Sequence, residues 1–207
     1  MDEKSVLHDA LKRSRADLVA KLDGLAEYDV RCPMTPTGTN LLGLVKHVGI
    51  ASIGYFSVVF GRDPGIDVVA LWGTGDENLW ARAGQTRQRI LDLYAHAARV
   101  SDDTIAALDL DAPGVVPWWP PATQQVTLCQ IIIHLILEIE RHAGHADLLR
   151  ELIDGQAGRH ADDPSLGART LEQWADRRGR IEQAARAAAA AETSDHAPMP
   201  CSSTKLE

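Results

Sequence analysis

The amino-acid sequence predicts an all-α fold: a four-helix bundle with long connecting loops and an extra C-terminal helix. Apolar residues recur with a period of about 3.6 over several long stretches, which is the pattern of amphipathic helices. No segment of useful length shows the two-residue alternation that is typical of a half-buried strand. Capping signals precede two of the periodic stretches, so these helices have defined starts.

The first half of the chain alternates between periodic segments and loops that contain proline and glycine. Its predicted helices cover residues 2–26, 40–60, 76–99 and, as a short helix, 102–108. The second of these is apolar nearly all round, which indicates a place at the centre of the fold. Thr74 and Glu77 have the spacing of a capping box and predict the start of the third helix.

The second half contains a long helix over 127–153 and a last helix over 169–191. Thr127 and Gln130 form a capping box at the start of the long helix, and Gly155 is suited to its C-cap. The segment before this helix holds four prolines and the pair Trp118-Trp119. We therefore expect an apolar loop that packs over another part of the protein.

Length and composition indicate one soluble domain, which we expect over residues 1–191, followed by a disordered tail over 192–207. The formal charge of −8 argues against general nucleic-acid binding, because that needs an excess of Lys and Arg. The N-terminus lacks a signal-peptide pattern, and the apolar stretch 131–139 is too short to span a bilayer. The three cysteines fit neither a zinc motif nor a disulfide framework. We expect a cytoplasmic protein without a membrane partner.

Four ionisable residues gather on one face of the predicted helix 127–153. His134, Glu138, His142 and His145 fall within about 80° of arc at 100° per residue. Glu138 and His142 are four residues apart, so their side chains converge. Their apolar neighbours indicate that this face is buried, and a buried carboxylate needs a partner. Either a self-contained hydrogen-bond network or a divalent metal ion satisfies that need.

A metal ion would need another ligand from a second helix, because one helix face offers only two well-placed donors. His47 is the candidate, since it is the one histidine in the apolar segment 40–60. A lone histidine there is more often a hydrogen-bonded core residue, but the four ionisable residues on the facing helix reverse that preference. The residue pattern alone leaves both alternatives open and favours the metal.

The chain also resembles the DinB/YfiT-like superfamily, in its actinobacterial branch near mycothiol-dependent maleylpyruvate isomerase and related thiol transferases. The resemblance covers about residues 5–190 and is specific because its motifs occur in order and at matching spacing. The motifs are PMTPTGTNLLGLVKH at 33–47, Tyr55-Phe56 with Phe60-Gly61-Arg62, VPWWP at 116–120, RHAGHAD at 141–147 and RELIDG at 150–155, with His134 preceding them on the last helix.

This resemblance implies a DinB-like bundle that holds one divalent metal ion through His47, Glu138 and His142. His134 and His145 then lie around the metal or in the pocket. The sequence departs from close relatives at two places: Ser52 stands where a Glu is frequent, and Cys129 stands near a frequent His. Any catalytic part that those groups play in relatives is therefore in doubt here.

The resulting hypothesis is a metal-dependent enzyme that uses a low-molecular-weight thiol such as mycothiol for S-transfer or isomerisation of a small molecule. Zinc is the first choice, with nickel, iron and manganese as alternatives. His145 or His134 would handle protons, and Arg141 would hold a carboxylate unless it is a surface ion-pairing residue. Trp118 and Trp119 would cover the pocket and exclude water from it, or would only cover the end of the bundle.

Two other functions fit the same residues. The first is a non-catalytic bundle of the stress-protein type that binds a metal or small molecule, and the second is a metal-dependent hydrolase. A homodimer is also compatible with the large apolar helix faces. The sequence does not identify the substrate.

Overall fold

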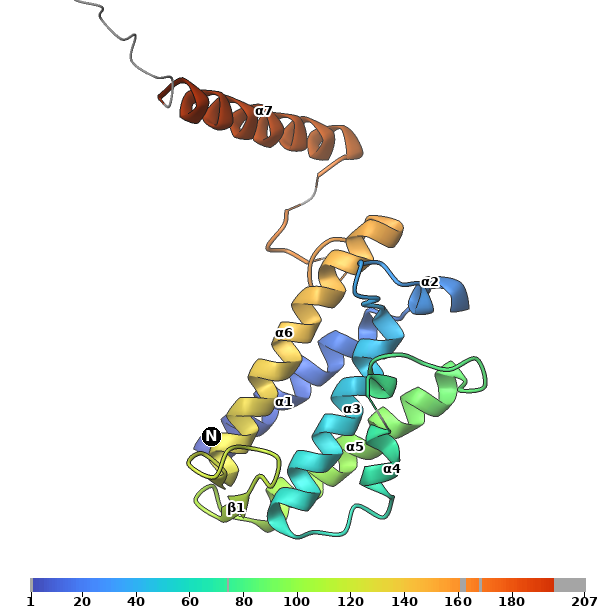
Figure 1. Ribbon diagram of the computed structural model, residues 1–207, viewed down its shortest axis with the longest axis vertical. Coiled ribbons are helices and arrows are strands. Elements are labelled where there is room, and N and C mark those ends of the chain that lie inside the picture. Colours follow the sequence, from blue (N-terminus) through green and yellow to red (C-terminus); the bar gives the residue numbers. More distant parts are fainter. Residues whose placement is uncertain (1, 74, 161–162, 168, 196–207) are drawn as a thin grey trace, which may run out of the picture. The chain divides into compact units, whose positions relative to one another are not determined.

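The computed structural model describes residues 2–73, 75–160, 163–167 and 169–195. The chain divides into two compact units, Met1–Asp163 and Pro164–Glu207. The first unit contains all the helices of the bundle and the small β-hairpin, and the second contains the helix α7 (Figure 1).

Four long helices form the bundle and confirm the predicted all-α fold. They are α1 (Glu3–Ala20), α3 (Leu41–Ser57), α5 (Arg87–Ala107) and α6 (Leu128–Asp154). Helix α3 packs against both α5 and α6, and α1 packs mainly against α6. The predicted first helix was too long, because its pattern runs on into a turn and a separate short helix, α2 (Glu27–Arg31).

Helix α3 lies at the centre of the bundle, as its apolar composition predicts. All of its residues are buried except His47. Together with the following 3-10 turn it is long and apolar enough to cross a membrane, but 89% of the relevant window is buried inside the protein. Burial of this kind is what the core helix of a bundle shows, since apolar side chains on every side meet neighbouring helices.

Helix α6 begins and ends where the sequence predicts. The Thr127 side chain accepts a hydrogen bond from the Gln130 backbone N–H, and the Gln130 side-chain oxygen accepts one from the Thr127 backbone N–H, which completes the capping box. Gly155 closes the other end with a φ of 79°, a left-handed conformation that glycine adopts without strain. This helix carries most of the predicted site residues, so its caps help to fix their height in the bundle.

The prediction for the third helix was wrong. Helix α5 begins at Arg87, after Thr86 as its N-cap, and Glu77–Leu79 form only a short 3-10 turn, η2. The Lys46 ammonium explains the difference, because it binds the carbonyl oxygens of Glu77 and Trp80 and so holds this segment as a loop over α3. Thr74, the other half of the expected capping box, lies outside the described residues.

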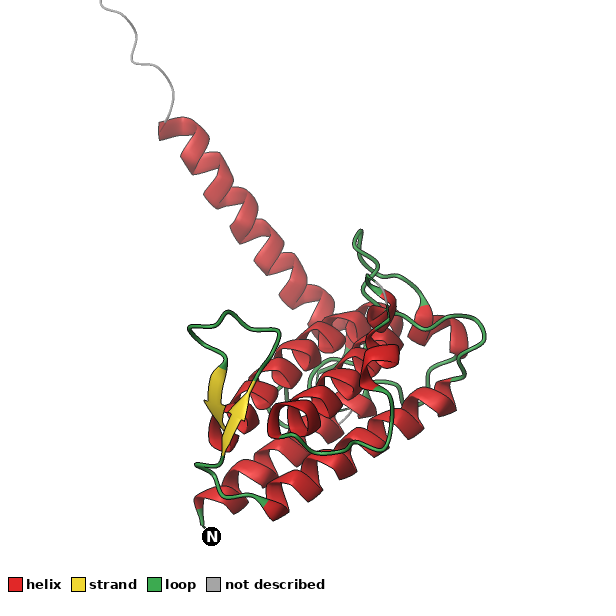
Figure 2. Cartoon of the chain, turned by 60° about the horizontal axis from the view of Figure 1, so that its bottom comes forward, coloured by secondary structure: helices red, strands yellow, loops and turns green. Residues whose placement is uncertain are grey.

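Two short insertions shape the bundle surface where the sequence predicts only loops. Helix α4 (Val68–Trp72) follows a 3-10 turn, η1 (Val58–Phe60). A hairpin of three-residue antiparallel strands, β1 (Pro113–Val115) and β2 (Gln125–Thr127), precedes α6 and places the Trp118-Trp119 loop at its tip (Figure 2). These strands are too short to give a readable alternation of apolar and polar residues.

Helix α7 (Leu171–Asp195) makes up most of the second unit. It is a solvated helix with ion pairs at four-residue spacing between Asp176 and Arg180 and between Glu182 and Arg186. It extends the predicted helix 169–191 by one turn. The rest of the expected tail, residues 196–207, lies outside the described residues. One domain over 1–191 stays a prediction.

Candidate metal centre

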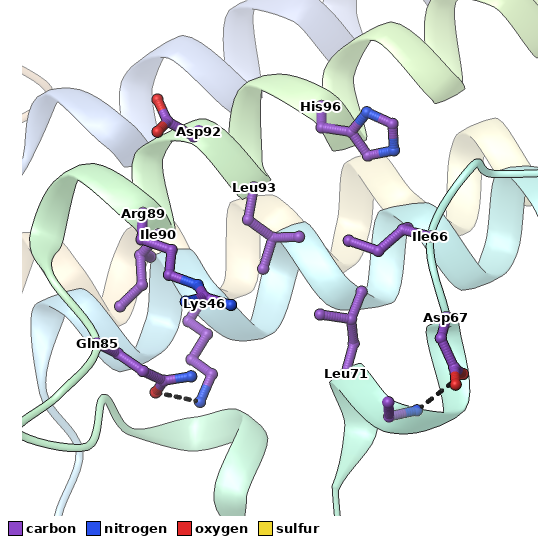
Figure 3. A pocket seen from close by; sticks show the side chains of 11 residues that line it. Lys46, Ile66, Asp67, Leu71, Gln85, Arg89, Ile90, Asp92, Leu93 and His96 are labelled. Atoms are coloured by element: carbon purple, nitrogen blue, oxygen red, sulfur yellow. Dashed lines mark hydrogen bonds between the residues drawn. The ribbon is translucent and has the colours of Figure 1, made fainter.

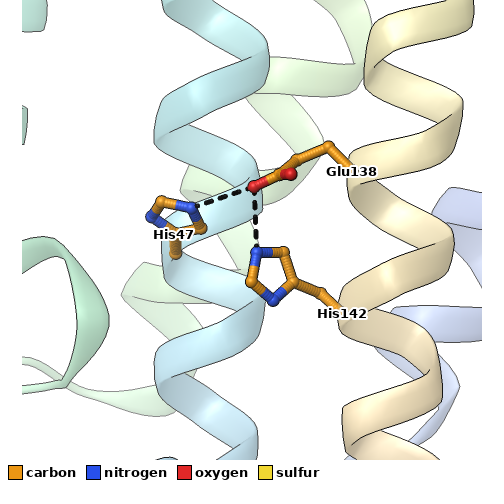
Figure 4. Close-up of side chains that lie close together, drawn as sticks. All are labelled: His47, Glu138 and His142. Atoms are coloured by element: carbon orange, nitrogen blue, oxygen red, sulfur yellow. Dashed lines mark hydrogen bonds and ion pairs between the residues drawn. The ribbon is translucent and has the colours of Figure 1, made fainter.

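Helices α3 and α6 bring His47, Glu138 and His142 together inside the bundle. The carboxylate of Glu138 lies between the two imidazoles, with Oε1 3.0 Å from His142 Nε2 and 3.5 Å from His47 Nε2 (Figure 4). One ligand atom from each residue lies within 4.8 Å of the other two. Within the described part of the chain this is the single such cluster of His, Cys, Asp and Glu.

These distances fit a small divalent cation. Donor atoms about 2.0–2.1 Å from a metal ion are about 3.3 Å apart in a tetrahedron and about 3.0 Å apart in an octahedron. The distances from Glu138 Oε1 to the Nε2 atoms of His142 and His47 lie at or close to these values. Two imidazoles and one carboxylate also form a donor set that zinc and other first-row metals accept, with positions left open for a further ligand.

The pKa shifts of Glu138 and His142 suit metal binding. Burial acts to raise the pKa of the Glu138 carboxyl, but the charge and hydrogen bonds of His142 and His47 outweigh it and hold the pKa below its usual value. Burial lowers the pKa of His142, against the opposing effect of Glu138. An ionised carboxylate and a neutral imidazole are the forms that bind metal ions.

A residue that the sequence analysis missed orients His47. The buried Asn78, in the turn η2, accepts a hydrogen bond from His47 Nδ1 at 3.3 Å, which leaves Nε2 to face Glu138. Partners of this kind fix the tautomer and the ring orientation of metal-binding histidines. His142 differs, because its Nδ1 is buried without a hydrogen-bond partner among the described residues.

An apolar cavity of about 540 Å³ opens next to the trio. His47, Glu138 and His134 line it together with Ala51, Tyr55, Trp72 and Trp118. The Trp72 ring meets His47 edge-on, with ring centroids 6.1 Å apart. The cavity therefore joins the candidate ligands to a largely aromatic wall, a composition that is typical of small-molecule sites.

Of the two tryptophans in the hairpin loop, Trp118 lines this cavity, and Trp119 lies beside it against Tyr55 and His134. Both indole N–H groups donate hydrogen bonds to the Tyr55 hydroxyl, from Trp119 at 3.0 Å and from Trp118 at 3.3 Å. The Trp119 ring also contacts His134, with centroids 5.0 Å apart. The sequence points to Tyr55 only through the family resemblance, which gives this residue no role.

The remaining predicted residues lie at different depths. His134 is half-buried beside Tyr55, and burial lowers the pKa of its imidazole against the pull of Glu138. His145 is exposed, with its ring 5.6 Å from that of His142, and Arg141 is exposed on the same helix. Ser52 is buried in α3, and Cys129 is half-buried in the first turn of α6.

A second cavity of about 530 Å³ lies between α3, α4 and α5 (Figure 3). Lys46 is its most deeply buried charge, and its ammonium already donates to two backbone carbonyls and to Gln85 Oε1. A cation with all three donors in use holds the loop in place and has none left for a ligand. The cavity beside His47 is therefore the better candidate site.

Comparison with known proteins agrees with this arrangement. No curated protein sequence matches the chain. A crystal structure of a conserved protein from Enterococcus faecalis has a similar fold, with a TM-score of 0.53 and 16% sequence identity over 75% of this chain and 99% of that chain. The model of the Mycothiol-S-transferase family matches residues 6–155, which run from the second turn of α1 to the end of α6 and include the whole trio. The chain therefore belongs to the mycothiol-S-transferase family, within the DinB-like superfamily that its motifs resemble.

Proposed function

We propose that this protein is a metal-dependent transferase that joins the sulfur of a low-molecular-weight thiol to a small apolar electrophile. The observation that carries the proposal is the cluster of His47, Glu138 and His142, in which His47 and Glu138 line an apolar cavity. A metal-binding donor set and a space for an apolar molecule share one site, as a transfer between a thiol and an electrophile requires. Membership of the family supports mycothiol as the thiol.

In this proposal His47, Glu138 and His142 hold one divalent cation, with zinc as the first choice. A bound zinc ion would supply a positive charge that favours the thiolate over the thiol at neutral pH. Asn78 keeps the His47 ring in the orientation that presents Nε2. Glu138 neutralises part of the charge in a half-buried site, which a neutral donor could not do.

The other predicted residues serve the two substrates. Trp118 and Trp119 exclude water from the cavity side, where the electrophile binds. Arg141 and His145 are exposed on the same helix, so they are available to the polar part of a thiol that enters from solvent. Arg141 would hold a carboxylate of that thiol, and either His145 or the cavity residue His134 would accept its proton.

Metal analysis and thiol turnover test this proposal together. Protein loaded with zinc and then desalted should retain one ion per chain, and the cobalt-loaded form should gain a sulfur-to-metal absorption band when mycothiol is added. The variants H47A, E138A and H142A should each lose the ion and the thiol transfer. The variant H96A is the matched control, because His96 is a half-buried histidine that binds the Pro64 carbonyl in the other cavity.

The outcomes separate the three candidate functions. Full metal occupancy in any of the three ligand variants would contradict the ligand assignment. A bound ion with no thiol-dependent absorption change would remove the transferase. It would leave a hydrolase or a non-catalytic binding protein, and turnover of ester or amide substrates distinguishes those two.

A further inference from the structure

The Tyr55 hydroxyl has an unusual set of hydrogen bonds for a buried phenol. Its side chain is buried in α3, lines the cavity and accepts hydrogen bonds from the indole N–H groups of both Trp118 and Trp119. A phenol oxygen can accept such bonds and donate one through its own O–H. The two indoles occupy the accepting positions, so the hydrogen is directed elsewhere.

No hydrogen bond donated by the Tyr55 O–H is present among the described residues. A buried donor without an acceptor is unfavourable, and in native proteins such a group calls for an explanation. The hydroxyl lies on the wall of a cavity, so an acceptor atom of a bound molecule is the simplest partner. The two indoles fix the oxygen in place before that molecule arrives.

The height of Tyr55 in the bundle relates it to the metal centre. Helices α3 and α6 run antiparallel, since His47 meets His142 at one level and Tyr55 meets His134 at another, with ring centroids 5.1 Å and 4.8 Å apart. His134 precedes Glu138 by four residues and His142 by eight, so along α6 the Tyr55 level is about 6 Å from Glu138 and about 12 Å from His142. A small molecule can therefore reach the Tyr55 hydroxyl while its reacting atom faces the metal side.

We propose that Tyr55 donates a hydrogen bond to the oxygen of the electrophile on which negative charge develops. This inference rests on the proposed function and names its substrate class: an apolar epoxide or α,β-unsaturated carbonyl compound. The thiolate sulfur forms a bond to carbon. In the epoxide the electron pair of the broken C–O bond stays on oxygen. In the carbonyl compound the C=C π pair forms the new C=C bond of the enolate, and the C=O π pair moves to oxygen. That oxygen ends protonated in the epoxide product. In the carbonyl product the proton ends on carbon. The thiol proton, released to a base or to water, balances the step.

An alkyl halide is the alternative class of electrophile, and it would gain little from a hydrogen bond donated by the Tyr55 O–H. Its leaving group is a large, weakly accepting halide, whereas a preorganised O–H stabilises a developing oxyanion strongly. The cavity walls of Ala51, Trp72 and Trp118 accept the apolar body of any of these molecules. The Tyr55 O–H therefore sets the preference for oxygen-containing electrophiles over alkyl halides, and the apolar walls of the cavity do not.

Three electrophiles of similar size test the assignment: styrene oxide, an aryl vinyl ketone and benzyl chloride, each with mycothiol and the zinc-loaded protein. The variant Y55F should lose about 100-fold in kcat/KM for the first two, which is the effect of removing one oxyanion donor. Its rate with benzyl chloride should change little. An equal loss for all three would mean that Tyr55 only holds the hairpin, and would overturn the proposal.

Two matched variants separate donation from positioning. W118F and W119F each remove one indole N–H and keep both the aromatic ring and the Tyr55 hydroxyl. If the hydroxyl acts on the substrate, each of these variants should show a smaller selective loss for the two oxygen-containing electrophiles than Y55F, because it loosens the donor but keeps it. A selective loss in W118F or W119F that equals that of Y55F would refute direct donation.

A binding measurement on the metal-free protein gives a readout that does not depend on turnover. Acetophenone has a carbonyl acceptor and ethylbenzene has none, and both can be titrated by quenching of tryptophan fluorescence. The wild type should bind acetophenone several-fold more tightly than ethylbenzene, and Y55F should lose the difference. If thiol transfer is absent in every variant, the proposed function fails, while this titration still decides the role of Tyr55.

Discussion

Replacing Asn78 with alanine should weaken metal binding without removing any ligand. Asn78 is buried and accepts the hydrogen bond of His47 Nδ1 at 3.3 Å, so alanine leaves this ring nitrogen without its partner. The surrounding loop should stay in place, because Lys46 continues to bind the carbonyl oxygens of Glu77 and Trp80. The change is therefore confined to the orientation and tautomer of one ligand.

The size of the effect follows from what else holds the His47 ring. Loss of an outer hydrogen-bond partner typically costs 10- to 100-fold in metal affinity, or about 1.4–2.7 kcal/mol. The rings of Trp72 and His142 flank His47, with centroids 6.1 Å and 5.1 Å away, and keep part of its orientation. The hydrogen bond is also near the long end of the usual range. We expect about a tenfold rise in the zinc Kd, the lower end of the range.

Competition with a chromophoric zinc chelator measures this Kd directly. N78D keeps an acceptor at the same place and should bind zinc at least as tightly as the wild type, while N78A should bind it more weakly. Thermal unfolding of the metal-free proteins checks that neither variant has lost its fold. An unchanged Kd in a folded N78A would show that Asn78 does not set the orientation of His47.

Three further predictions concern the scaffold. G43A should destabilise the protein by about 1–3 kcal/mol, as overpacking of a core does, because a Cβ on Gly43 would lie 1.9 Å from the backbone oxygen of Leu79. A melting temperature equal to that of the wild type would contradict this close approach. T127A should cost about 1 kcal/mol in urea unfolding through loss of the α6 N-cap, and T127S should restore most of it. D102N should destabilise the protein at neutral pH, since the effect of burial on the Asp102 carboxyl is outweighed by its hydrogen bonds to Arg15 and His8, which hold its pKa below its usual value. The stability that the ionised Asp102 contributes is present above about pH 4 and is lost as the pH falls through the folded-state pKa. The free energies of unfolding of the wild type and D102N should therefore converge in acid. A difference between them that stays constant with pH would rule out the charge as its source.

The sequence predicts the parts of this protein whose pattern is long and regular. Helices α3 and α6 follow from apolar periodicity and from the Thr127 capping box, and the candidate ligands follow from a four-residue spacing on one helix and a single histidine on the other. These features depend on local geometry that periodicity describes well.

The start of α5 and the partners of the site could not be predicted in this way, because they depend on contacts between distant segments. The decisive contact is that of Lys46 with the carbonyls of Glu77 and Trp80, which turns an expected helix into a loop and brings Asn78 to His47. One signal was present: a lysine in a nearly all-apolar helix must find acceptors when it is buried. The sequence does not say which acceptors these are.

The burial of α3 has a consequence for how members of this scaffold can diverge. Every described position of that helix except His47 is buried, and His47 is half-buried at the cavity. Substitutions along α3 would therefore disturb packing before they altered chemistry. New substrate ranges would evolve more readily in the hairpin tip around Trp118 and in the segment around Trp72, where side chains face the cavity from outside the core.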